Sequence, residues 1–352
     1  MTYIWYALLA AGLALILTPL VRKFAFRVNA VDVPRPPRNL HSKTVAKLGG
    51  LVVFLAFTIC ILVYVATSNQ FDISIIPLKF VWALLGGGAI LMLGGFLDDK
   101  YELPPYLLWI FPAIAALIVV LSGIGVGITF LSNPFGGTIS LGFKVLGIPA
   151  SAIFIFIWMN GMMFTTKFLD GLDGLVAGIG LIAGLTLFAL SLGETVSQPI
   201  TASFAIILVG ALAGYLIYAF HPASIFLGEG GSTYIGFVLG VLSVILGGKI
   251  ATALLVMGIP ILDVAWVIIQ RLMSGKSPFR GDRLHIHFKL IDLGFSQRST
   301  ALILYGMSAV FGFTAVFLQS MGKLVALGIL FGLMVVLISF VLRQFRKERL
   351  DS

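Results

Sequence analysis

Two acidic pairs have the spacing that metal and phosphate chemistry requires. Asp98 and Asp99 are adjacent in GGFLDDKYEL, at the end of an apolar run. Asp170 and Asp173 follow in FLDGLDGL, where an i,i+3 spacing on a helix would place both carboxylates on one face. Adjacent carboxylates at a membrane boundary repel each other and lose hydration, so water or a divalent cation has to offset this repulsion and lost hydration. A solvated helix end and a turn between spans are the structural alternatives for the two pairs.

Two later segments carry groups that bind anions. Glu229 lies in HPASIFLGEGGSTYIGF, a glycine-rich loop whose backbone N–H groups, at the start of the next helix, can hold an anion. His285 and His287 lie among cations in SPFRGDRLHIHFKL, which favours phosphate binding over metal ligation. An ordinary loop on the cytoplasmic side is the alternative for the second segment.

The elements that position these residues are membrane-spanning helices. Hydrophobic residues make up 59% of the 352 positions and charged residues 11%, whereas soluble domains are about one quarter charged. The sequence predicts an all-α polytopic membrane protein, a single integral-membrane domain over residues 1–352, with eleven spans, or ten if two nearly continuous runs merge. The predicted spans are 3–21, 49–67, 79–97, 106–124, 147–166, 174–192, 201–220, 233–248, 249–270, 300–318 and 324–342.

Lysine and arginine set the predicted orientation, because they stay preferentially on the cytoplasmic side. No cation precedes the first span and seven follow it, so the N-terminus is expected outside and the C-terminus in the cytoplasm. All four histidines and most carboxylates then fall on the cytoplasmic side, which indicates a one-sided polar site. On the outer side, residues 125–145 predict a small β-hairpin around Asn133-Pro134 and Gly136-Gly137.

Charge and cysteine content exclude other classes of protein. The net charge of +9 is explained by topology and by anionic lipid headgroups. The basic residues flank spans and form no separate module, which argues against nucleic acid as a partner. Cys60 is the single cysteine, so the chain has no internal disulfide.

In this order and spacing, the segments resemble the polyprenyl-phosphate N-acetylhexosamine-1-phosphate transferases, the polytopic family of WecA, TagO and MraY (glycosyltransferase family 4). The resemblance spans nearly the whole chain, through the aspartate pair, NPFGG, DGLDGL, PAxxFxGExGS, Pro260-Ile261-Leu262-Asp263 and HIHFKL…GFSQR, and is closer to the WecA/TagO branch. It implies transfer of a sugar-1-phosphate, GlcNAc-1-phosphate above others, from a UDP-N-acetylhexosamine to undecaprenyl phosphate with release of UMP. The implied setting is the bacterial cytoplasmic (inner) membrane, the implied site faces the cytoplasm, and the product feeds a cell-envelope glycan such as teichoic acid or lipopolysaccharide.

The resemblance also implies a role for each matching residue. Asp98, Asp99, Asp170 and Asp173 match the catalytic acidic residues. Mg²⁺, or alternatively Mn²⁺, is expected at Asp99, Asp170 and Glu229, since this cation prefers oxygen ligands and bridges phosphates. The residues expected to bind substrate are His41, Lys167, Gly228, Ser232, Arg280, Arg283, His285 and His287. A homodimer is the expected assembly.

The chain departs from the family pattern at several polar positions. Phe164 and Lys167 stand at the two asparagines of N-A-V-N, and Glu229 stands at the metal-binding aspartate of M-G-D-x-G-S. Leu108 and Pro112 stand where a lysine and a glutamine are expected. The remaining departures are Ala219 for an asparagine and Phe288 for a third histidine.

Three interpretations of these departures remain open. In the first, Lys167 contacts a phosphate, Glu229 still ligates Mg²⁺, and the donor or metal preference has changed. In the second, the chain keeps the fold with lost or altered activity. The third is a polytopic transporter, since Asp263 lies near a span end, although the polar residues gather at one face and no inverted repeat is visible.

Overall fold

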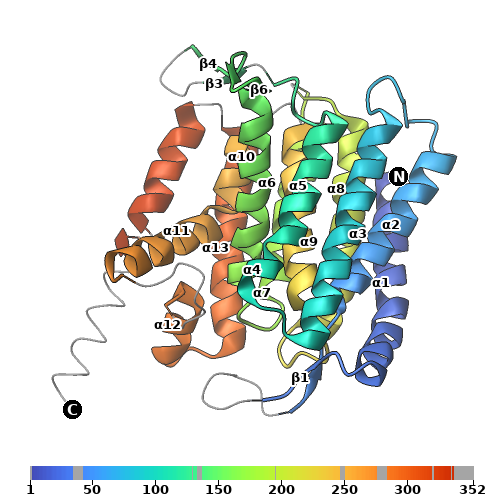
Figure 1. Cartoon of the computed structure of the whole chain (residues 1–352), viewed down its shortest axis with the longest axis vertical. Helices are drawn as coiled ribbons and strands as arrows, with labels where there is room; N and C mark the ends of the chain where they lie inside the picture. The colour runs from blue at the N-terminus through green and yellow to red at the C-terminus, as the bar shows by residue number, and fades with distance from the viewer. Residues whose placement is uncertain are drawn as a thin grey trace.

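The computed structural model describes residues 2–34, 43–128, 130–132, 137–194, 196–245, 250–275, 284–318, 321–333 and 335–336. Figure 1 shows its helices gathered into one bundle. The helices are α1 (Thr2–Arg27), α2 (Gly49–Thr67), α3 (Leu78–Tyr101), α4 (Pro105–Leu108), α5 (Ile110–Ser122), α6 (Ala150–Leu169), α7 (Leu175–Leu192), α8 (Pro199–Ala219), α9 (Gly228–Ile245), α10 (Ile250–Val256), α11 (Gly258–Met273), α12 (Ile286–Asp292) and α13 (Gln297–Phe317). The strands are β1 (Val31–Asp32), β2 (Val45–Ala46), β3 (Phe130–Ser132), β4 (Thr138–Ser140), β5 (Lys144–Val145) and β6 (Ile148–Pro149).

Most of the predicted spans appear as single apolar helices. In the described part of the chain, eight helices are each long and apolar enough to cross a membrane, namely α1, α2, α3, α6, α7, α8, α9 and α13. The predicted spans at 106–124 and 324–342 overlap shorter apolar helices, Tyr106–Ser122 and Met321–Leu333, and residues 334 and 337–342 lie outside the described part of the chain. The all-α membrane fold is therefore confirmed, whereas the count of eleven spans stays a prediction.

The span predicted at 249–270 is broken and does not form one straight helix. α10 and α11 meet the length criterion only as a pair, and they are bent by 78°. Pro260 lies in the first turn of α11, where proline is tolerated, whereas inside a continuous helix it would remove a hydrogen bond and clash with the preceding turn. In Figure 1, α11 consequently runs across the direction of the other helices.

The predicted hairpin is confirmed, and it marks one end of the bundle. β3 and β4 pair antiparallel, with Phe130 opposite Ser140 and Ser132 opposite Thr138. The predicted tip at 133–136 lies outside the described residues. Figure 1 places the N-terminus and the β3–β4 hairpin at one end of the bundle, and β1 and α12 at the other. Which end faces the cytoplasm stays a prediction.

α9 is almost entirely enclosed by the bundle, and glycines let neighbouring backbones approach its first turn closely. Every residue from Gly230 to Val244 is buried. A Cβ on Gly95 of α3 would overlap the backbone of Gly230, and a Cβ on Gly50 of α2 would overlap that of Gly231. Small residues that permit such close approach are typical of membrane helix interfaces. The glycine-rich stretch around Glu229 is thus the first turn of a packed helix, where the sequence predicted a loop.

Candidate active site

The acidic pair at the end of α3 performs two separate tasks. Asp98 Oδ1 accepts a hydrogen bond from the Leu103 N–H at 2.9 Å, which closes the end of the helix. Asp99 is buried against α9, where its Oδ1 accepts from the Glu229 N–H at 3.4 Å. Lys47 Nζ lies 3.8 Å from the same oxygen. Because successive helical residues point about 100° apart, only the second carboxylate faces the first turn of α9.

The first turn of α9 forms one wall of the site through its backbone. Gly228 has a φ of 73°, and a Cβ there would overlap the Asp99 carboxylate. Glycine is therefore required both for the backbone conformation and for space. Ser232 was predicted to bind substrate, but it is buried and its hydroxyl donates to the carbonyls of Gly228 and Glu229 at 3.2 Å. Gly228 therefore lies at the site, whereas the Ser232 hydroxyl is hydrogen-bonded to carbonyls of its own helix.

The D-G-x-D-G run forms a turn between α6 and α7, so the helical arrangement predicted for it is wrong. Gly174, just before α7, has a φ of 72°, a conformation that glycine adopts easily and that ends the preceding structure. The two aspartates consequently have different surroundings. Asp173 Oδ2 lies 2.7 Å from His221 Nδ1 and accepts the Ala223 N–H at 3.0 Å. Asp173 thereby ties the turn to the segment between α8 and α9.

Asp170, the residue that follows α6, belongs to the acidic cluster. Protein surrounds most of its carboxyl group, although the residue as a whole is exposed to solvent. The loss of hydration, followed by the negative charges of Glu229, Asp99 and Asp173, raises the pKa of Asp170 to about 8. Burial and like charge both favour the neutral acid. A bound cation would therefore stabilise the ionised carboxylates of the cluster.

Lys167 and Glu229 bring α6 and α9 together at this cluster. Lys167 Nζ lies 2.5 Å from Glu229 Oε1, and each side chain is 17% exposed. The same ammonium lies 5.7 Å from the centre of the Phe164 ring, one helical turn earlier on α6. Lys167 thus lies between two other positions at which the chain departs from the family pattern, Phe164 and Glu229.

The two histidines lie beside the turn that carries Asp170. His285 Nδ1 lies 2.8 Å from Asp263 Oδ2 on α11, and its ring stacks on His287 with 5.6 Å between ring centres. His287 is fully buried. A Cβ on Gly171 would overlap its imidazole. The histidine motif therefore contacts the turn, as a site that combines them requires. The predicted substrate-binding residues that lie outside the described part of the chain are His41, Arg280 and Arg283.

Three residues at the site were not among the candidates taken from the sequence. Lys47 approaches Asp99, Asp263 holds His285, and His221 holds Asp173. Asp263 ends the Pro260-Ile261-Leu262-Asp263 segment that forms part of the family resemblance, which was the available signal. His221 begins HPAS, and Lys47 is one of several cations after the first span, so neither stood out.

The fold and the site together define a class: a multi-spanning membrane protein with carboxylates, lysines and histidines at one end of its helices. Residues 81–247 match the sequence profile of Glycosyl transferase family 4. Over 337 residues the chain is 31% identical to the decaprenyl-phosphate N-acetylglucosaminephosphotransferase of Mycobacterium tuberculosis. This alignment covers 88% of this chain and 80% of the relative.

Two further relatives extend this similarity. The probable undecaprenyl-phosphate N-acetylglucosaminyl 1-phosphate transferase of Bacillus subtilis is 29% identical, over 91% of this chain and 86% of its own. The phospho-N-acetylmuramoyl-pentapeptide-transferase of Staphylococcus aureus is 30% identical, over 87% and 96%. The chain belongs to glycosyl transferase family 4.

Proposed function

We propose that this protein transfers N-acetylglucosamine 1-phosphate from UDP-N-acetylglucosamine to undecaprenyl phosphate and releases UMP, as the first membrane step of a cell-envelope glycan pathway. The names of the Mycobacterium and Bacillus relatives support a polyprenyl phosphate acceptor and this amino sugar. The observation that carries the proposal is the convergence of Asp99, Asp170, Glu229 and Lys167 from three helices at one end of the bundle. A water-soluble nucleotide and a lipid phosphate can meet only at such a boundary.

The reaction exchanges one phosphoanhydride bond for another. An oxygen of the lipid phosphate attacks the β-phosphorus of the UDP-sugar, the bond from that phosphorus to the bridging oxygen breaks, and UMP leaves with that oxygen. Phosphoryl transfer depends mainly on positioning and on neutralised charge. Lys47 and Lys167 provide positive charge beside the carboxylates. We favour direct attack by the lipid phosphate, without a covalent enzyme intermediate.

The donor chemistry of the site fits Mg²⁺, with Mn²⁺ as a substitute. Asp99 and Asp170 present carboxylate oxygens whose charges act on each other. Among the described residues, no three acidic, histidine or cysteine side chains form a ready-made ligand set. Mg²⁺ commonly takes one or two carboxylates and completes its shell with water and substrate phosphates. When bound here, the cation would neutralise and orient those phosphates.

We place the site on the cytoplasmic face of the bacterial cytoplasmic membrane. Two segments that carry or adjoin cations lie at the same end of the bundle (Figure 1). They are β1, which lies among the seven cations that follow the first span, and α12, which carries Lys289. Cytoplasmic segments are rich in Lys and Arg, which supports this orientation. A transporter would hold its substrate near the middle of the membrane, whereas these charged groups lie at helix ends. The homodimer implied by the resemblance remains a prediction.

A release assay tests the proposal. Purified protein in nanodiscs receives UDP-N-acetylglucosamine, undecaprenyl phosphate and Mg²⁺, and UMP and the lipid product are measured by chromatography and mass spectrometry. We expect both products in equal amounts, their loss in Asp99→Asn, and normal turnover in Asp72→Asn, which changes an exposed loop residue. Absence of UMP with every UDP-sugar tried, combined with flux of a solute through proteoliposomes, would refute the proposal.

A further inference from the structure

We infer that Glu229 acts as a positioning residue for the Lys167 ammonium and not as a metal ligand, so that Lys167 is a fixed phosphate-binding cation. Given the transfer reaction proposed above, the ligand for this ammonium is the diphosphate of the UDP-sugar. The metal would then be held on the protein side by Asp99 and Asp170 alone.

The first support is that the unusual residues form one contacting unit. Glu229 Oε1 contacts Lys167 Nζ at 2.5 Å, and the Phe164 ring lies 5.7 Å from the same nitrogen. A carboxylate on one side and an aromatic face on the other both stabilise an ammonium ion. Phe164 and Lys167 are three residues apart on α6, so a single helix turn presents both. A cation held from two sides has lost most of its conformational freedom before a phosphate binds.

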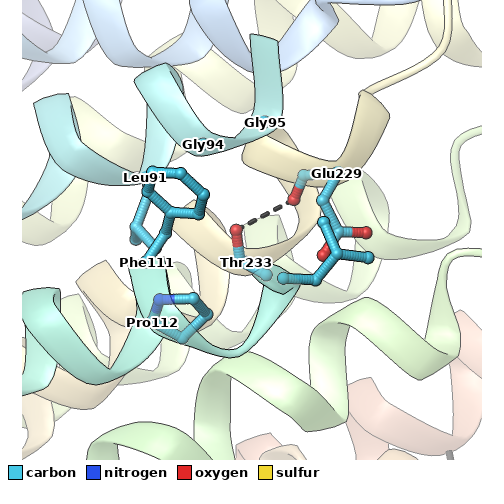
Figure 2. Close-up of a pocket in the computed structure, with 8 residues that line it drawn as sticks. Leu91, Gly94, Gly95, Phe111, Pro112, Glu229 and Thr233 are labelled. Atoms are coloured by element: carbon cyan, nitrogen blue, oxygen red, sulfur yellow. Dashed lines mark hydrogen bonds between the residues drawn. The ribbon is translucent and has the colours of Figure 1, made fainter. Parts of the chain in front are cut away.

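The second support is that the backbone and the side chain of Glu229 already have partners within the protein. Its backbone is fixed, because its N–H donates to Asp99 at 3.4 Å and its carbonyl accepts from the Thr233 hydroxyl at 2.9 Å (Figure 2). Glutamate is one methylene longer than aspartate, and this length lets the carboxylate of α9 meet the ammonium of α6. A metal would have to displace that ammonium. Separating a partly buried pair leaves each charge poorly solvated.

The third support is a pocket beside Glu229 whose described lining residues carry no positive charge. This small pocket opens between α3, α5 and α9. Of the described residues that line it, only Glu229 and Thr233 are polar, and the rest include Leu91, Phe111 and Pro112 (Figure 2). Leu108 also lines the pocket. The cation in direct contact with Glu229 is Lys167 of α6, whereas the described lining of this pocket offers a phosphate none.

A charge-balanced double variant separates the two roles of Glu229. Lys167→Met/Glu229→Gln removes one positive and one negative charge at nearly constant volume, so the net charge around the metal is unchanged. Mn²⁺ binding is followed by electron paramagnetic resonance without substrates. UDP-N-acetylglucosamine binding is followed by calorimetry and needs no turnover. Lys79→Met, which changes a lysine next to Phe80 near the start of α3, is the matched control.

The inference predicts a split between the two measurements. In the double variant, the Kd for Mn²⁺ stays within about threefold of wild type, while the Kd for the UDP-sugar rises about 10- to 100-fold, as the loss of a charged hydrogen bond would produce. The single variant Lys167→Arg, which keeps the positive charge, retains most of the wild-type affinity for the UDP-sugar. Lys167→Met alone tightens Mn²⁺ binding, because Glu229 is released. The control changes neither constant.

Opposite results would overturn the inference. A tenfold or larger loss of Mn²⁺ affinity in the double variant would show that Glu229 ligates the metal. An unchanged Kd for the UDP-sugar would remove Lys167 from phosphate binding. If the proposed transfer itself were wrong, wild-type protein would release no UMP, while the two binding constants would still distinguish the roles of Glu229 and Lys167.

Discussion

The buried contact between Asp263 and His285 allows the histidine motif to be tested with two variants of one residue. Asp263 Oδ2 lies 2.8 Å from His285 Nδ1, and its Oδ1 accepts the Ile286 N–H at 2.9 Å. The two side chains are 3% and 6% exposed. An ionised carboxylate can only accept hydrogen bonds, so it keeps a hydrogen on Nδ1 and fixes the plane of the ring.

The two variants are expected to separate folding from function. Asp263→Ala leaves two buried donors without partners, at about 1–3 kcal/mol each, so the free energy of unfolding should fall by about 2–6 kcal/mol. Asp263→Asn keeps an oxygen for the Ile286 N–H but turns an NH₂ group toward His285, which has to move its hydrogen to Nε2. We expect this variant to lose about 1 kcal/mol of stability and about 10- to 100-fold in kcat/KM, the typical effect when the partner that orients a functional histidine is changed.

Thermal unfolding and the UMP-release assay measure the two effects on the same preparations. Asp72→Asn is the control, because Asp72 is exposed and its Oδ1 accepts the N–H of the neighbouring Ser74 at 2.8 Å. If Asp263→Asn turned over at the wild-type kcat/KM, the orientation of His285 would be irrelevant to catalysis. If Asp263→Ala unfolded at the wild-type temperature, the buried contact would not contribute to the fold as argued.

Three further predictions concern the acidic cluster. Asp170→Asn should reduce kcat by more than about 1000-fold, since charge stabilisation dominates phosphoryl transfer, while the protein remains folded in size-exclusion chromatography; near-normal kcat would remove Asp170 from the catalytic set. Gly228→Ala should lower kcat/KM about 100-fold or more because its Cβ overlaps Asp99, whereas Gly86→Ala, with open space around it, should not; equal effects would contradict this account. The pKa of Asp170 is raised to about 8 in the folded protein, so its contribution to stability is complete below its ordinary pKa of about 4 and is lost as pH rises through about 8. Without divalent cations, the Tm of wild type should therefore fall between about pH 4 and 8 more steeply than that of Asp170→Asn, and parallel curves would exclude this cause.

The sequence predicted the helices well because span length and apolar composition are local properties. It also located the β3–β4 hairpin, whose alternating residues and central Asn133-Pro134 carry a local signal. The bend between α10 and α11 was missed, since an apolar run looks the same in sequence whether its helix is straight or broken, as this one is between Val256 and Gly258. The first turn of α9 was missed because glycines indicate a loop, and only contact with Gly50 and Gly95 makes a helix favourable there.

The structure brings several of the predicted site residues to one end of the bundle, but their roles stay predictions and several of their contacts could not be inferred. Asp99 and Glu229 meet through the hydrogen bond from the Glu229 N–H, and Asp170 lies close enough for its charge to act on both. The partners of Asp173 and Asp263 could not be inferred, because His221 and His285 lie 48 and 22 residues away and meet them only after the helices pack. Such pairs depend on which helices pack together and on which residues become buried, and a local sequence pattern specifies neither.

The backbone contacts of α9 with α2 and α3 have a consequence for how this site can vary. Side chains at a helix interface can change rotamer and let two helices slide by a fraction of an ångström, but Gly95 against Gly230 and Gly50 against Gly231 leave no side chain to adjust. The spacing between the carboxylate of α3 and the start of α9 is therefore set by the hard radii of main-chain atoms. A change of substrate preference would have to come from segments that surround this spacing, because the spacing itself has no tunable part.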